Sequence, residues 1–163
     1  MTENQIITFR TEVREEDIST VREIIVSTGF FYDIEVPVAI ELVRERYEQG
    51  QNSDYHVLFA EVDGKTVAYS CFGHIAGTDG SFDLYWIATH NDCRGKGTGK
   101  QLLEETEKVI QQMGGRLLIA ETSTLEKYAP TRYFYEKAGY TLEAEIKDYY
   151  KIGDGKVIFV KRF

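Results

Sequence analysis

Apolar residues recur along this chain with two different periods, and the changes from one period to the other predict its secondary structure. Alternation and runs of β-branched or aromatic residues predict strands at 6–13, 56–62, 66–72, 82–89, 116–122, 140–146 and 157–163. Apolar residues three or four positions apart predict helices at 18–28, 36–47, 102–113 and 130–139. This order of strands and helices favours a mixed α/β domain.

Glycine-containing turns join these predicted elements and indicate how the strands pair. Asp63-Gly64 is typical of a tight antiparallel hairpin between 56–62 and 66–72. A second turn at 77–80 leads into the strand at 82–89, which completes an antiparallel meander of three strands. The helix at 102–113 then joins two strands as a crossover, which makes the strands 82–89 and 116–122 parallel. Gly153-Asp154-Gly155 is expected to turn the chain into its last strand.

Length, composition and charge narrow the function classes. The 163 residues, 42% of them hydrophobic and only two of them proline, predict one packed domain over 1–163. The longest apolar runs fall far short of the ~20 residues of a membrane span, and no export signal precedes the first strand, so we expect a soluble cytoplasmic protein. A net charge of −8 argues against nucleic-acid binding. Cys71 and Cys93 lack metal-ligand spacing and are expected to be free thiols, and no metal is expected.

A glycine-rich segment between the third meander strand and the next helix carries the clearest chemical signal. In Arg94-Gly95-Lys96-Gly97-Thr98-Gly99, glycines alternate where a helix begins, and such a turn offers free backbone N–H groups to a pyrophosphate. A nucleotide-hydrolase loop would need Ser or Thr at Gln101. The dinucleotide fingerprint would need glycine at Lys100. Both of these alternatives therefore fail.

The same segment matches Arg/Gln-x-x-Gly-x-Gly and resembles the pyrophosphate loop of the GNAT acyltransferases. The downstream run Tyr133-Phe134-Tyr135-Glu136-Lys137-Ala138-Gly139-Tyr140 is similar to that family as well. The resemblance implies a sheet of about seven strands with an antiparallel meander, a parallel pair at the cofactor site and about four helices. It also implies transfer of an acetyl group from acetyl-CoA to a primary amine of a small molecule or peptide in a ternary complex. A non-catalytic acyl-CoA-binding module is the alternative.

The resemblance assigns roles to particular residues. The backbone of Ile87, Ala88 and Thr89 would bind the pantetheine arm. The pyrophosphate would be held by Arg94, Gly95, Lys96, Gly97, Thr98, Gly99 and Lys100. Tyr135 matches a tyrosine that can protonate the departing thiolate. Tyr128 stands where many members carry Asn, so its contact with the cofactor arm departs from the family pattern.

The base and the acceptor pocket are less defined by the sequence. Asp83 lies where several family members carry a glutamate base, and Glu121 or a water chain is the alternative. Phe30-Phe31-Tyr32 and Tyr149-Tyr150 could line the acceptor pocket or cover the core and the sheet edge. Family members often pair through edge strands or the last hairpin, so a homodimer is an open alternative. The acceptor amine is left undefined.

Overall fold

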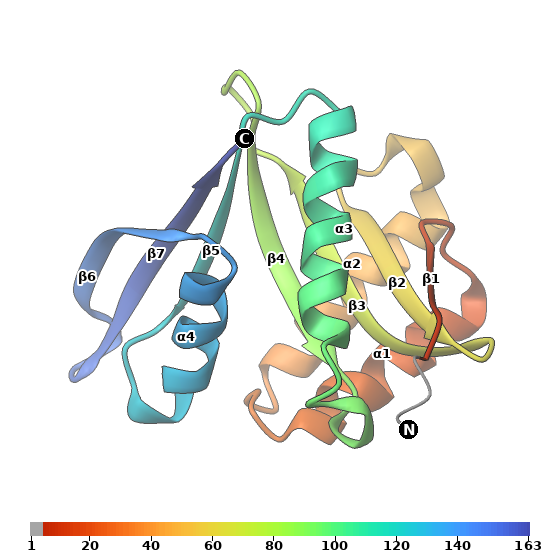
Figure 1. Cartoon of the computed structure of the whole chain (residues 1–163), viewed down its shortest axis with the longest axis horizontal. Coiled ribbons are helices and arrows are strands. Elements are labelled where there is room, and N and C mark those ends of the chain that lie inside the picture. Colours follow the sequence, from red (N-terminus) through yellow and green to blue (C-terminus); the bar gives the residue numbers. More distant parts are fainter. Residues whose placement is uncertain (1–4) are drawn as a thin grey trace. The chain divides into compact units, whose positions relative to one another are not determined.

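The computed structural model describes residues 5–163, which form seven strands and four α-helices (Figure 1). The strands are β1 (Ile7–Arg10), β2 (His56–Val62), β3 (Lys65–His74), β4 (Ser81–Thr89), β5 (Leu117–Ser123), β6 (Thr141–Lys151) and β7 (Asp154–Arg162). The helices are α1 (Glu15–Thr28), α2 (Glu35–Gln49), α3 (Thr98–Gln112) and α4 (Ala129–Lys137). The strand order is β1-β2-β3-β4-β5-β7-β6, and β4 pairs in parallel with β5. The mixed sheet and the parallel pair predicted from the sequence are confirmed.

The described chain divides into two compact units. One unit holds the residues up to Gly73 together with Tyr85–Lys108, and the other holds His74–Leu84 and Val109–Phe163. Strand β4 contributes to both, because its first four residues pair with β5 whereas its last five belong to the first unit. The expectation of a single domain over 1–163 stays a prediction.

In the first unit, helices cover both faces of the antiparallel strands. Side chains along β3 point alternately to the two faces, and both sets are buried. Tyr69 and Cys71 point into a cluster of buried residues that α1 and α2 supply, including Val21, Ile25 and Val43. Ser70 points to the opposite face, where its hydroxyl lies 2.7 Å from that of Thr106 on α3. Figure 1 accordingly shows α3 on one side of these strands and α1 and α2 on the other.

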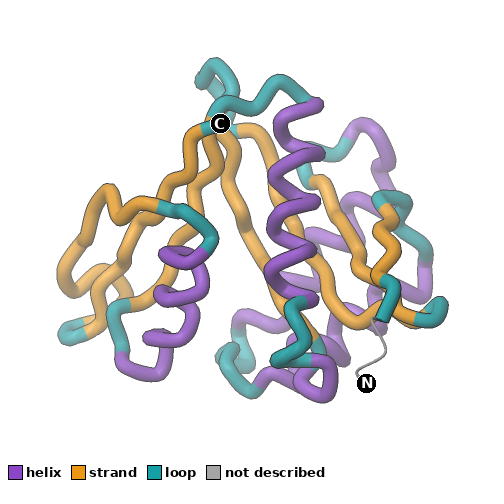
Figure 2. Tube along the Cα trace, in the orientation of Figure 1, coloured by secondary structure: helices purple, strands orange, loops and turns teal. Residues whose placement is uncertain are grey.

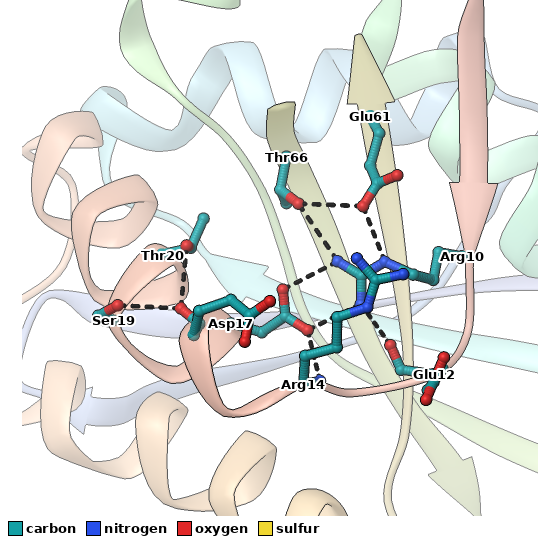
Figure 3. A network of polar contacts seen from close by, with 9 residues as sticks. Arg10, Glu12, Arg14, Asp17, Ser19, Thr20, Glu61 and Thr66 are labelled. Carbon is teal, nitrogen blue, oxygen red and sulfur yellow. Dashed lines mark hydrogen bonds and ion pairs between the residues drawn. The ribbon is translucent and has the colours of Figure 1, made fainter. Parts of the chain in front are cut away.

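A partly buried polar network holds the start of α1 against β1 and β2 (Figure 3). The Arg10 guanidinium donates to both carboxylate oxygens of Asp17, at 2.8 and 2.9 Å, and to Glu61 at 2.7 Å. The Asp17 side chain also accepts the backbone N–H of Arg14 at 2.7 Å, which caps the start of α1. One arginine therefore links β1, β2 and the first turn of α1.

Tyr69 is completely buried, and its hydroxyl has no hydrogen-bond partner among residues 5–163. A buried polar atom without a partner costs about 1–3 kcal/mol. We therefore predict that Tyr69→Phe raises the free energy of unfolding by about 1 kcal/mol, measured by urea denaturation. The exposed Tyr47→Phe on α2 is the control and should change it little. A loss of stability in Tyr69→Phe would show that a buried water satisfies the hydroxyl.

In the second unit, β5, β7 and β6 form an antiparallel group that α4 covers on one face. Ala120 is the register partner of Phe159, and the Phe159 ring packs 5.7 Å from that of Tyr135 on α4. The next register pair, Glu121 and Ile158, consequently points to the other face. Strand β6 lies at the edge, every one of its residues is exposed, and its register with β7 is irregular.

The expected turn at Gly153-Asp154-Gly155 is wrong in its position. Lys151 already pairs with Asp154, so the turn consists of residues 152–153, and β7 begins at Asp154 instead of at 157. Asp154 is buried and accepts a hydrogen bond from the Ser123 hydroxyl. A Cβ on Gly155 would lie 2.9 Å from the Ile146 carbonyl oxygen. Gly155 therefore serves close strand packing, whereas Gly153, with φ 85°, makes the turn.

Candidate active site

The end of β4 leads directly into the predicted pyrophosphate loop, and backbone hydrogen bonds fix the path of the chain. The His90 N–H donates to the Val67 carbonyl at 2.8 Å, which holds the strand end against β3. A short 3₁₀ turn at Asn91–Cys93 follows, and the Asn91 N–H donates to the Ser27 hydroxyl at 3.0 Å. The loop thus begins from a position fixed by β3 and α1 (Figure 2).

Two glycines of the loop adopt the left-handed conformation just before α3. Gly95 has φ 77° and Gly97 has φ 79°, and a Cβ at either position would meet no atom of the described chain within 4 Å. The backbone is therefore open to the approach of a ligand at both positions. The Gly97 carbonyl accepts the Gln101 N–H at 3.1 Å, so α3 starts immediately, with its unpaired N–H groups and positive dipole end at the loop.

Cationic side chains surround this turn. Arg94 and Lys96 are exposed, and the Arg94 guanidinium lies 5.4 Å from the centre of the Phe30 ring. Lys100 is exposed as well and lies 4.0 Å from Glu104 on the next turn of α3. A pocket of about 310 Å³ beside the loop is lined by residues that include Lys65, Lys96 and Thr98. The geometry and charge of this loop fit a pyrophosphate.

The aromatic residues predicted to be near the acceptor divide into different roles. Phe31 packs against the core cluster of the first unit, with its ring 4.9 Å from that of Trp86. Phe30 lies under Arg94, and Tyr32 is half exposed. The core interpretation therefore holds for Phe31, whereas Phe30 contacts the glycine-rich loop.

Tyr135 lies on the buried face of α4, where its side chain is 5% exposed. Its ring packs between the rings of Phe134, Tyr140 and Phe159, at 5.4–5.7 Å. Burial raises the pKa of the Tyr135 phenol well above its ordinary value. The hydroxyl stays protonated near neutral pH, as that of an ordinary tyrosine does, and burial makes it a weaker acid. Tyr128 precedes the same helix and is partly buried.

Asp83 and Glu121, the two candidate bases, lie in the second unit together with a lysine that sequence reasoning missed. Lys156 on β7 contacts the Glu121 carboxylate at 2.5 Å. Burial raises the pKa of the half-buried Asp83, the Glu121 charge raises it further, and Lys156 lowers it. Tyr149 and Tyr150 pack edge to face at 4.9 Å, and the Lys156 ammonium lies 4.1 Å from the Tyr149 ring. No spacing rule in the sequence pairs Lys156 with Glu121, because only the register of β5 and β7 brings them together.

Comparison with known proteins identifies the family. A model of the acetyltransferase (GNAT) domain matches residues 53–142. A GNAT-family protein from Desulfovibrio desulfuricans is 43% identical, over 96% of this chain and 99% of that chain, with a TM-score of 0.94. The chain belongs to the GNAT acetyltransferase family. It is therefore an acetyltransferase whose acetyl donor is acetyl-CoA, as the glycine-rich loop predicted.

More distant solved structures share the GNAT fold. The ribosomal-protein-S18-alanine N-acetyltransferase from Escherichia coli is 18% identical, over 96% of this chain and 94% of that chain, with a TM-score of 0.73. A Salmonella typhimurium protein solved with its cofactor acetyl-CoA is 17% identical, over 96% and 93% of the two chains, also with a TM-score of 0.73. Comparison with curated protein sequences gives no match.

Two further findings concern only residues 5–163. None of the helices in this part of the chain is long and apolar enough to cross a membrane. Within the same residues, no group of three or more His, Cys, Asp or Glu side chains is placed to hold a metal ion.

We predict that Gly97→Asp weakens acetyl-CoA binding far more than it weakens the fold. The new Cβ would clash with nothing, and aspartate tolerates the left-handed conformation, so the stability cost should stay near 1 kcal/mol. The added carboxylate would instead repel a pyrophosphate at the loop. Calorimetry with acetyl-CoA measures the binding, and thermal unfolding without ligand measures the fold. Gly77→Asp, at an equally open left-handed glycine between β3 and β4, is the matched control and should leave acetyl-CoA affinity intact.

Proposed function

We propose that this GNAT enzyme transfers the acetyl group of acetyl-CoA directly to a primary amine of a small molecule or peptide. The observation that supports it most is the turn at Gly95 and Gly97, whose open backbone stands at the start of α3. Backbone N–H groups there, together with Arg94, Lys96, Thr98, Gly99 and Lys100, would bind the pyrophosphate. The end of β4 at Ile87, Ala88 and Thr89 would bind the pantetheine arm through its backbone, and Tyr128 is a further proposed contact.

The proposed chemistry needs proton transfers at both reacting atoms, the acceptor nitrogen and the thioester sulfur. The acceptor ammonium must lose a proton before its nitrogen can attack the thioester carbon, and Asp83 is the proposed acceptor of that proton. As the C–N bond forms, the attacking nitrogen loses its second proton to solvent. As the C–S bond breaks, the departing thiolate takes a proton from the Tyr135 hydroxyl, and solvent returns a proton to the phenolate. The half-buried carboxylate of Asp83, whose pKa is raised, supports its assignment as the base, whereas the assignment of Tyr135 rests on the family resemblance. No covalent intermediate on the enzyme is required.

The test of the proposed function is release of free thiol from acetyl-CoA in the presence of candidate acceptors. A panel of amines, amino acids, polyamines, aminoglycosides and amino-terminal peptides covers the proposed class, and mass spectrometry of the product should show one added acetyl group. Thermal shift with acetyl-CoA runs in parallel, because a ligand that binds the folded state raises the melting temperature. A shift without turnover of any amine would instead favour a binding module that does not catalyse transfer.

We infer a cytoplasmic location from the thiols. Cys71 is buried and Cys93 is half-buried, and both are free. Free cysteines are typical of proteins in reducing compartments.

A further inference from the structure

Three charged side chains of the second unit form one cluster on the face of the sheet that α4 does not cover. Asp83 on β4 is the register partner of Ile119 on β5, so it shares a face with Glu121, two residues further along β5. Lys156 comes from β7. Glu121 shares its face with Ile158, its register partner, and Lys156 lies two residues before Ile158 on the same face. Two carboxylates and one ammonium leave a single negative charge, which suits an acceptor that arrives as a monocation.

The two carboxylates differ in what they contact. The Lys156 ammonium is 2.5 Å from Glu121 and is mostly buried, with its side chain 13% exposed. Burial disfavours its charge, but hydrogen bonds to Glu121 and Tyr149 outweigh that effect and raise the pKa of Lys156. Lys156 consequently stays charged and engaged with Glu121. Asp83 is half-buried and interacts electrostatically with both Glu121 and Lys156.

The other titratable residues near these three side chains do not alter the difference between the paired Glu121 and Asp83. Tyr149 and Tyr150 of β6 flank the Lys156–Glu121 pair, and burial raises the pKa of Tyr150, so its phenol stays neutral. His74 packs its ring against Phe82 at 5.5 Å and hydrogen-bonds the Thr78 carbonyl. Phe82 is adjacent to Asp83 on β4, so its side chain points to the opposite face.

We propose that Lys156 and Glu121 are positioning residues that make Asp83 the proton acceptor of this enzyme. The ammonium of Lys156 occupies Glu121 in an ion pair, which leaves Asp83 as the carboxylate able to take a proton from the acceptor. The step moves one proton from the acceptor nitrogen to an Asp83 oxygen and yields a neutral amine and a neutral carboxyl group. This inference rests on the proposed acetyl transfer to an amine.

The arrangement predicts shifts of opposite sign for two neutralising substitutions. Glu121→Gln removes a negative charge and releases Lys156, so the pKa of Asp83 should fall. Lys156→Gln removes the positive charge, so the pKa of Asp83 should rise. A carboxylate base must be deprotonated to work, so the acid limb of the rate profile should move to lower pH in Glu121→Gln and to higher pH in Lys156→Gln.

The first measurement follows the side-chain carboxyl carbon of Asp83 by NMR in the full-length protein without ligands. Arg162→Gln is the matched control, because it breaks an exposed ion pair between β7, which also carries Lys156, and Glu143 of β6. It should leave the Asp83 titration unchanged. Lys156→Arg, which keeps the positive charge, should restore the wild-type titration if Lys156→Gln folds poorly. Shifts of the same sign in Glu121→Gln and Lys156→Gln, or no shift in either, would overturn the proposal.

The second measurement is the pH dependence of kcat/KM with the best amine of the acceptor panel. The acid limb should follow the NMR values of Asp83 in every variant. Asp83→Asn should lose about 10²- to 10⁴-fold in rate, the usual contribution of a general base, and Glu121→Gln should lose less. If Glu121→Gln loses more than Asp83→Asn, Glu121 is the base and this inference is wrong although the proposed function stands. If no amine is acetylated, the proposed function itself fails.

Discussion

Tyr135→Phe should slow acetyl transfer by about 10²- to 10⁴-fold without abolishing it. A CoA thiolate is a fairly stable anion near neutral pH, so a proton donor accelerates its departure but is not indispensable. The phenyl ring would keep the packing against Phe134, Tyr140 and Phe159, so acetyl-CoA affinity and thermal stability should change little. Loss of kcat at unchanged affinity is the signature of an interaction made only in the transition state.

A neighbouring tyrosine supplies the control for this experiment. Tyr140 is 4% exposed and packs 5.5 Å from the Tyr135 ring, so Tyr140→Phe removes a buried hydroxyl from the same aromatic cluster. Its rate should stay close to the wild-type value. If Tyr135→Phe acetylates a good acceptor at the wild-type rate, with chemistry shown to limit turnover, Tyr135 is a core aromatic and the proton comes from elsewhere.

Arg10→Met should lower the free energy of unfolding by about 3–5 kcal/mol, because it leaves Asp17 charged and buried without its partner. The side chains of Arg10 and Asp17 are only 12% and 3% exposed. Methionine replaces the aliphatic part of arginine but cannot donate to Asp17 or Glu61, which lose 2.7–2.9 Å hydrogen bonds. Urea denaturation at neutral pH measures the loss.

Two further variants, one at Asp17 and one at an exposed ion pair, provide controls for the stability loss of Arg10→Met. The double variant Arg10→Met with Asp17→Asn should recover part of the loss, because a neutral amide oxygen can still accept the Arg14 N–H that caps α1. Arg162→Met breaks an exposed pair and should cost less than about 1 kcal/mol. An equally small effect of Arg10→Met would mean that water reaches Asp17 readily.

Local signals in the sequence predicted most of the fold. Strand β2 matches its predicted range because residues of high β-propensity end at Asp63-Gly64, both of which adopt positive φ in the hairpin. Helix α1 ends where the sequence indicated, at the left-handed Gly29. The last turn was misplaced because Gly155 is required by the nearby Ile146 carbonyl, a contact between strands that no local pattern reveals.

The candidate site was predictable to the extent that it is local. The loop from Arg94 to Lys100 is one continuous stretch of sequence. Its left-handed glycines and its position at the start of α3 could therefore be predicted from its residues. The Lys156–Glu121 pair joins residues from β7 and β5, and it depends on a register that only the folded sheet defines. Alternation along a strand places side chains on a face but does not tell which strands become neighbours.

The exposed edge strand β6 affects how the protein behaves at high concentration. An eleven-residue edge with free backbone groups could recruit a strand from a second chain and start aggregation. Charged side chains interrupt this edge at Glu143, Glu145, Lys147 and Lys151, and Asp148 takes a left-handed φ of 53° where the register breaks. A charged and bent edge is a poor template for further strands. Chains that are still folding are therefore less prone to join edge to edge, although β6 also presents Leu142, Ile146 and two tyrosines to water.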